Sequence, residues 1–83
     1  MADRLHLKFG MAKEVALDDP KCIEIYRRYR ALRTGVGLLN GDDTPEAKLL
    51  LCELIDALGG RIVNEWTGET MTKEAAKRYV MGR

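Results

Sequence analysis

His6 is the only histidine in the chain, and its ordinary pKa lies near neutral pH, where a side chain can exchange protons. A catalytic or metal-binding role would need organised partners, and the natural candidates are Cys22 and Cys52. The two cysteines lie 30 positions apart among apolar neighbours, without the close cysteine or histidine pairs of zinc sites. We therefore expect neither a metal site nor a cysteine nucleophile, and we interpret both cysteines as reduced core residues.

Paired carboxylates are a second arrangement that could do acid–base chemistry. The sequence offers four such pairs: Asp18 with Asp19, Asp42 with Asp43, Glu53 with Asp56, and Glu65 with Glu69. Three of these pairs fall at helix starts, loops or turns, where carboxylates cap backbone amides and stay hydrated. Glu53 and Asp56 instead share one face of an expected helix, and nothing around them predicts the burial that would raise their pKa values. Their spacing favours ion pairing or contact with a partner over catalysis.

Two further chemistries lack a required residue. The chain contains no serine, so serine-based acyl transfer has no nucleophile. The glycine-rich residues 34–41 have Asn40 where the dinucleotide-binding pattern needs its last glycine, and they follow an expected helix instead of a strand. We therefore expect a non-enzymatic protein with no catalytic residues, no cofactor and no bound metal.

The first half of the chain contains one clear strand and one clear helix. Residues 4–9 alternate between apolar and polar side chains, which indicates a half-buried strand whose polar side, including His6, faces solvent. Residues 11–19 predict a short helical turn or an irregular arm. A helix follows through about residue 33, because Asp19 can cap free amides and Pro20 suits the first helical position.

The second half begins with a loop over residues 34–43. Thr44 and Pro45 then start a helix that Gly59 and Gly60 close. Branched and aromatic side chains predict a strand over residues 61–66, followed by a turn at 67–68. Residues 70–71 are a candidate edge strand, and Thr72 is the expected cap of a last helix.

These elements and the composition define the expected fold class. With 46% hydrophobic residues and a formal net charge of +1, the chain has enough apolar surface to fold, and 83 residues suit a single compact domain, 1–83. The order strand, helix, helix, strand, helix predicts a helix-dominated α+β domain. About three helices would pack on a short two- or three-stranded antiparallel ribbon.

The helix over residues 44–58 has more apolar surface than one core-facing stripe needs. Leu49 and Cys52 extend that surface towards the acidic side formed by Glu53 and Asp56. Such a helix is either the central element of the core or also touches a partner chain. We therefore count Leu49, Glu53 and Asp56 as candidate partner-binding residues, and a homodimer or other homo-oligomer is one form that the contact could take.

The charge is unevenly distributed along the chain. Residues 1–20 carry a net charge of −1, residues 21–34 of +4, residues 35–60 of −4 and residues 61–83 of +2. Arg27, Arg28 and Arg30 in the basic helix 21–33 could contact a partner or lie along a nucleic-acid backbone. The spacing favours the alternative that they form a solvated face or pair with the acidic residues of the second helix, because Tyr26 and Tyr29 fall on the buried stripe and could not stack on bases.

Trp66 is the only tryptophan, and two roles are open to it. It could seal the sheet against a helix, or it could anchor a partner protein, since tryptophan is enriched at interfaces. We favour the core role and keep Trp66 among the partner-binding candidates.

No apolar run is long enough to cross a membrane, and the first residues lack the pattern of an export signal, so we expect a cytoplasmic protein. Its mixed apolar, acidic and basic surface favours a small regulatory or inhibitory protein that binds another protein or a nucleoprotein complex. A bacterial or phage accessory protein that occupies a host enzyme's site would have this character. The alternative is an RNA- or DNA-binding module that uses helix 21–33.

Overall fold

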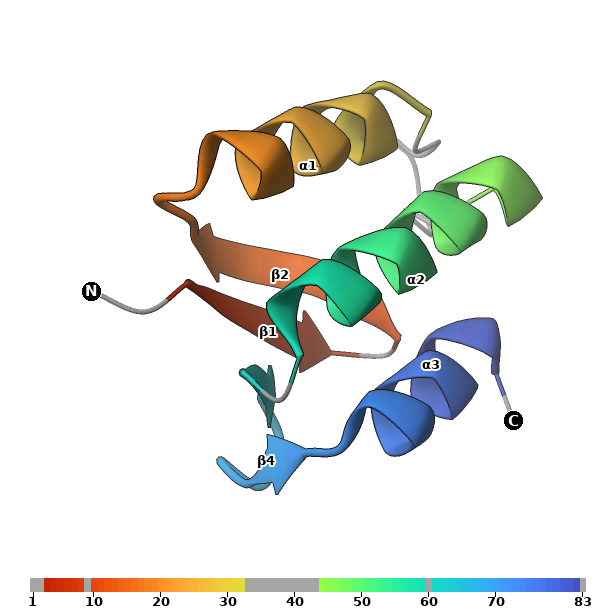
Figure 1. Ribbon diagram of the computed structural model, residues 1–83. Helices are drawn as coiled ribbons and strands as arrows, with labels where there is room; N and C mark the ends of the chain where they lie inside the picture. The colour runs from red at the N-terminus through yellow and green to blue at the C-terminus, as the bar shows by residue number, and fades with distance from the viewer. Residues whose placement is uncertain (1–2, 9, 33–43, 60, 83) are drawn as a thin grey trace.

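The computed structural model describes residues 3–8, 10–32, 44–59 and 61–82. Within these residues, three helices lie on one side of a four-stranded sheet (Figure 1). The small α+β fold with three helices on a short sheet is therefore confirmed. The elements are β1 (Arg4–Lys8), β2 (Met11–Ala16), α1 (Pro20–Leu32), α2 (Pro45–Leu58), β3 (Ile62–Asn64), β4 (Thr70–Met71) and α3 (Lys73–Met81).

The sheet is larger than expected and is mixed, with the strand order β2-β1-β3-β4. Strand β1 pairs antiparallel with β2 and parallel with β3, and β3 pairs antiparallel with β4. The prediction of an antiparallel ribbon was therefore wrong in strand number and direction. The physical reason is the connection: two helices separate β2 from β3, and a long crossover of this kind allows β3 to run in the same direction as β1.

Strand β2 replaces the helical turn or irregular arm expected for residues 11–19. The pairing of β1 with β2 shifts between His6 and Leu7, so that His6 lies opposite Glu14 while Leu7 lies opposite Ala12. Lys13 is thus the extra residue of a β-bulge. An extra residue breaks the two-residue alternation, which is why the pattern of β2 was not recognised as a strand.

The predicted helix starts are confirmed. Helix α1 begins at Pro20, and the side chains of Thr44 and Thr72 accept hydrogen bonds from the amides of Ala47 and Ala75 at the starts of α2 and α3. Gly59 ends α2 as expected, with a φ of 74° that favours glycine. The expected loop over residues 34–43 lies outside the described residues, as do Phe9 and Gly60.

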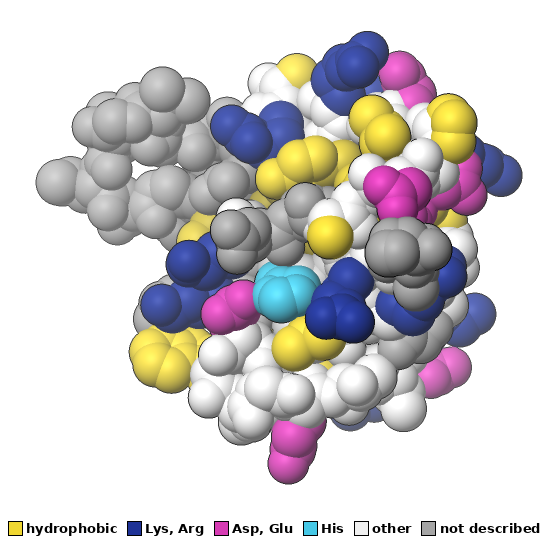
Figure 2. Space-filling view, turned by 90° about the vertical axis from the view of Figure 1, so that its left-hand side faces the viewer, with side chains coloured by type: hydrophobic (Ala, Val, Ile, Leu, Met, Phe, Trp, Pro, Cys, Tyr) yellow, Lys and Arg dark blue, Asp and Glu magenta, His cyan; other side chains and the backbone are white. Residues whose placement is uncertain are grey.

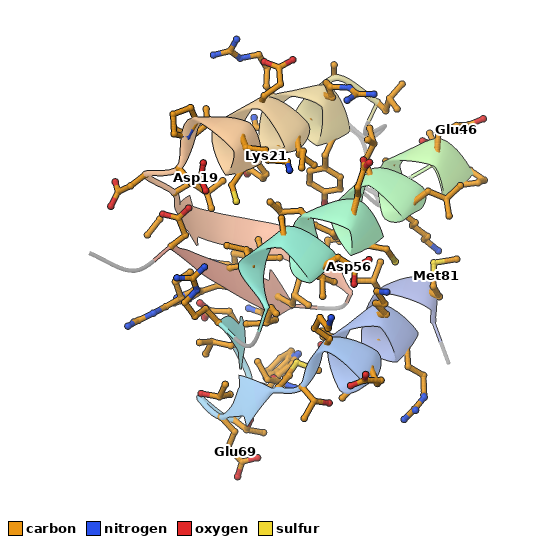
Figure 3. All side chains as sticks on the ribbon, in the orientation of Figure 1. Asp19, Lys21, Glu46, Asp56, Glu69 and Met81 are labelled. Carbon is orange, nitrogen blue, oxygen red and sulfur yellow. The ribbon has the colours of Figure 1, made fainter. Side chains whose placement is uncertain are left out.

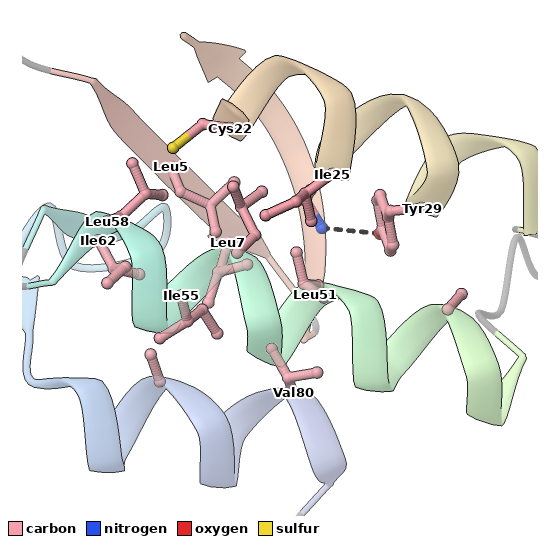
Figure 4. Close-up of a cluster of buried hydrophobic side chains, with 14 residues drawn as sticks. Leu5, Leu7, Cys22, Ile25, Tyr29, Leu51, Ile55, Leu58, Ile62 and Val80 are labelled. Carbon is pink, nitrogen blue, oxygen red and sulfur yellow. Dashed lines mark hydrogen bonds between the residues drawn. The ribbon is translucent and has the colours of Figure 1, made fainter. Parts of the chain in front are cut away.

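The core lies between the helices and one face of the sheet (Figure 4). Leu5 and Leu7 of β1 are fully buried there, whereas Arg4, His6 and Lys8 alternate with them on the other face. Helix α2 is central, because it packs against both α1 and α3 as well as β1. The remaining core residues are Ala12, Cys22, Ile25, Tyr29, Ala47, Leu51, Leu54, Ile55, Leu58, Ile62, Ala76 and Val80.

A buried hydrogen bond connects α1 to the bulged strand. The Tyr29 side chain is fully buried, and its hydroxyl oxygen accepts a 3.1 Å hydrogen bond from the backbone amide of Ala12 (Figure 4). Tyr26 is only half-buried and packs on the edge of the core. The expected burial of the two tyrosines is thus complete for Tyr29 and partial for Tyr26.

Candidate protein-binding site

The outer face of α2 carries the residues that the sequence suggested for partner binding. Leu49, Glu53 and Asp56 follow one another at steps of four and three, which places them on one side of the helix. The buried residues of α2, such as Leu51 and Leu54, lie on the other side. Leu49 is 62% exposed, more than any other large apolar side chain among the described residues.

A hollow of about 400 Å³, open to solvent, lies over this face of α2. The structure thus brings three of the predicted partner-binding residues together at one shallow, wide-open hollow, and it adds Leu50 and Cys52, which were not in the predicted set. Among the described residues, the hollow is lined by Leu49, Leu50, Cys52, Glu53 and Asp56.

Asp56 is held at the edge of the hollow by α3. Its carboxylate lies 2.8 Å from Lys77 Nζ and 4.0 Å from Lys73 Nζ, and it lies on the side of α2 that faces α3 (Figure 3). The hydrogen bond with Lys77 lowers the pKa of Asp56 and raises the pKa of Lys77. Glu53, by contrast, is exposed and makes no ion pair within the described part of the chain.

The three arginines of α1 do not form one surface. Arg27 pairs with Glu24 at 3.8 Å, and the Arg30 guanidinium lies over the Tyr26 ring at 5.9 Å. Successive helical residues are about 100° apart, so Arg28 and Arg30 project to opposite flanks of the helix with Arg27 between them. The acidic Glu24 further interrupts the basic charge, which weakens the case for helix 21–33 as a nucleic-acid site.

Trp66 is not part of the core, and the favoured interpretation was wrong. Its side chain is 60% exposed, and Lys8 Nζ lies 4.9 Å from the centre of its ring. The reason is that β3 ends at Asn64, so Trp66 falls in the following turn, where the alternation of a strand no longer sets the direction of side chains. The remaining role from the sequence, contact with a partner, stays a prediction.

The sequence analysis missed the partner of His6. Glu65 Oε2 accepts a 2.6 Å hydrogen bond from His6 Nδ1, and both side chains are about one quarter exposed. This hydrogen bond lowers the pKa of Glu65. The pair lies on the open face of the sheet, where the histidine is flanked by basic side chains (Figure 2), and neither residue lines the hollow on α2.

Asp3 is a second residue that the sequence analysis missed. It is only 4% exposed, and its carboxylate accepts hydrogen bonds from the backbone amides of Asp18 and Asp19 just before α1. These bonds lower the pKa of Asp3, whereas burial raises the pKa of the neighbouring Cys22 thiol. Asp3, Asp19 and Cys22 lie close enough to suggest a metal site, but hydrogen bonds already explain the positions of both carboxylates. Asp3 holds the two residues before α1, and Asp19 Oδ1 accepts a 3.0 Å hydrogen bond from the amide of Lys21 as the cap of the helix.

No family model, curated protein or solved structure matches this chain. Among the described residues, the helices are too short and too polar to span a membrane.

Proposed function

We propose that this chain is a small, non-enzymatic regulatory or inhibitory protein that binds a partner protein through the outer face of α2. The observation that supports this most directly is the hollow, since Leu49, Glu53 and Asp56 all line it. An exposed leucine in a concave surface with carboxylates beside it has the composition of an interface centre with a polar rim. Binding of a partner would explain why Leu49 is exposed, and it requires no catalytic group.

The chemistry of the hollow indicates what kind of segment it accepts. Its apolar side chains are Leu49, Leu50 and Cys52, and its charged side chains, Glu53 and Asp56, are both acidic. The complementary partner is a segment, such as an amphipathic helix, that presents apolar residues flanked by lysine or arginine. Such a segment would bury the leucines and would place its cations beside Glu53, because Asp56 already pairs with Lys77 of α3.

A second copy of the chain fits this face less well. In a two-fold dimer the same patch meets itself, so each Glu53 would approach the acidic residues of the other copy. Like charges at an interface are unfavourable. Charge complementarity therefore favours a different protein with a basic surface as the occupant.

The proposal can be tested with a defined probe. A helical peptide of leucines and lysines is titrated into the isotope-labelled chain, and backbone amide shifts are followed by NMR. We expect shifts that saturate and cluster on Leu49, Cys52 and Glu53. A twin peptide with glutamate in place of lysine should bind at least tenfold more weakly, because its charge matches that of the hollow.

Two matched variants locate the binding surface. Leu49→Lys should lower the affinity for the basic peptide at least tenfold, whereas Ile23→Lys makes the same change on α1 and should leave it unaltered. Ile23 is 36% exposed, so it tolerates the substitution. The proposed occupant would be wrong if both peptides bound equally or if both variants lost the same affinity. It would also be wrong if the chain associated with itself as its concentration rose and Leu49→Lys abolished that association.

A further inference from the structure

The open face of the sheet is a second surface with a different composition. The three helices cover only one face of the sheet (Figure 1), so the polar side chains of β1 remain on the outside. Arg4, His6 and Lys8 alternate there with the buried leucines, and Arg4 and Lys8 lie about 13 Å apart along the strand. A basic row of this length is built into the regular part of the fold.

Two neighbouring elements add to this row. Lys13, the extra residue of the bulge in β2 next to Glu14, is exposed and lies within electrostatic reach of Glu65. The turn after β3 brings the exposed ring of Trp66 against Lys8. The consecutive strands β1 and β2 thus contribute three cations, and the distant turn after β3 contributes one aromatic ring.

The acidic residues at this face are Glu65 and Glu14, which lies opposite His6 in β2. They are outnumbered by Arg4, Lys8 and Lys13, so a positive charge remains. Glu65 accepts a hydrogen bond from His6 and faces both Lys8 and Lys13, so its single charge is opposed by two lysines. Glu69 points away from the molecule at the end of the turn (Figure 3). The combination of an exposed aromatic ring with adjacent cations is the one by which proteins hold single-stranded nucleic acids, stacking bases on the ring and pairing phosphates with the cations.

We propose that the open face of the sheet binds single-stranded nucleic acid, with a base stacked on Trp66 and phosphates on Arg4, Lys8 and Lys13. This goes beyond the binding of a protein at α2 and uses none of the same residues. It also differs from binding through the arginines of α1. Binding would depend little on the nucleotide sequence of the strand, because every base has a face that can stack on the ring.

The chain contains its own reporter for this contact. Trp66 is the only tryptophan, so quenching of tryptophan emission by an unlabelled oligothymidylate reports stacking at this position alone. We expect saturable quenching, and we expect affinity to fall about 20-fold between about 50 and 200 mM salt if three phosphates are contacted. Fluorescence anisotropy of a labelled oligothymidylate measures the same binding in variants that lack the reporter.

Matched variants distinguish this face from α1. Trp66→Phe should keep most of the affinity and Trp66→Ala should lose at least fivefold, because phenylalanine retains a ring for stacking. Lys13→Glu alone, and with Lys8→Glu, should weaken binding progressively, whereas Arg27→Glu with Arg30→Glu makes the same charge change on α1 and should not. Circular dichroism and thermal melting check that each variant is folded.

Several results would overturn the proposal. Absence of quenching at low salt would exclude the contact, and a larger loss from the α1 variant than from the lysine variants would move the site to α1. Equal or tighter binding of polyglutamate would show that an acidic peptide is the occupant. Binding confined to vesicles with anionic lipids would show that the surface meets a membrane. None of these results would bear on the peptide titration at α2.

Discussion

The outer face of α2 and the open face of the sheet lie on the outside of the same core, yet their chemistry is opposite. The α2 face is apolar with two carboxylates, whereas the sheet face carries cations, a histidine and an aromatic ring. Both arise from the same local rule, since each element turns one side inward and leaves the other side to solvent. A domain this small therefore has two surfaces that can act independently, provided that their shared core is intact.

Outside the hydrophobic core, the largest expected effect on stability comes from a position that supports both faces. Gly10 connects β1 to β2 with a φ of 77°, and a Cβ at this residue would lie 2.8 Å from the backbone oxygen of Tyr79 in α3. We expect Gly10→Ala to lower the free energy of unfolding by about 2 kcal/mol or more. The substitution strains the backbone, and its Cβ overlaps a backbone oxygen that cannot move away as a flexible side chain could. Urea denaturation measures the loss.

Gly68→Ala is the matched control. Gly68 has a φ of 76°, but nothing lies within 4 Å of the position of its Cβ. The cost should be limited to the backbone strain of about 1 kcal/mol. If both variants lost the same free energy of unfolding, the close contact of α3 with the β1–β2 turn would not contribute to the cost of Gly10→Ala.

The next effect tests whether α1 supports the sheet face. Tyr29→Phe leaves the amide of Ala12, beside the bulge that carries Lys13, without its buried acceptor. We expect a loss of about 1 to 2 kcal/mol in the free energy of unfolding, the usual cost of an unsatisfied buried group. Tyr26→Phe, at a half-buried ring, should change stability by no more than about 0.5 kcal/mol. Similar losses in both variants would argue against a special role for the buried hydrogen bond.

Much of the fold could be predicted from local sequence patterns. The helix starts at Pro20, Thr44 and Thr72 depend on capping residues whose effect is local, and the structure confirms them. The parallel pairing of β1 with β3 could not be predicted in this way, because it depends on the path of two helices between them. Strand β2 could not be predicted for a similar reason. Its bulge at Lys13 interrupts the alternation of side chains, and only the pairing with β1 shows which residue is extra.

The two faces differ in how much of each was predictable. The α2 face comes from one helix, so the spacing of Leu49, Glu53 and Asp56 was enough to group them. The sheet face combines residues from β1, β2 and the turn after β3. The net charge of each segment gave no sign of this face, because residues 1–20 sum to −1 although they contain Arg4, Lys8 and Lys13.

A smaller effect on stability distinguishes surface residues from core residues. Trp66→Ala should lower the free energy of unfolding by only about 0.5 to 1 kcal/mol, the usual worth of an exposed cation–π contact such as that with Lys8. Leu49→Lys should change it by no more than about 0.5 kcal/mol. Leu54→Ala, at a fully buried side chain of the same helix, should cost about 2 to 5 kcal/mol. If Trp66→Ala lowered the free energy of unfolding as much as Leu54→Ala, Trp66 would have to be a core residue.

The smallest expected effect concerns the edge of the α2 hollow. Lys77→Gln removes the cation 2.8 Å from Asp56, so the pKa of Asp56 should rise towards its ordinary value while stability changes little, because both groups are exposed. In the unaltered chain, the pair stabilises the fold above the ordinary pKa of Asp56. That contribution is lost as pH falls through the lowered pKa of Asp56 or rises through the raised pKa of Lys77.

Carbon-13 NMR of the carboxyl groups measures this shift directly. In Lys77→Gln the Asp56 carboxylate should lose its charge at a higher pH than in the unaltered chain, so its share of the attraction for the basic peptide should disappear earlier during acidification. Arg78→Gln, on the same helix, should leave the titration of Asp56 unchanged, because the charges that lower its pKa are those of Lys77 and Lys73. An Asp56 titration that is identical in all three proteins would mean that α3 does not hold this carboxylate. Asp56 would then belong wholly to the partner-binding face.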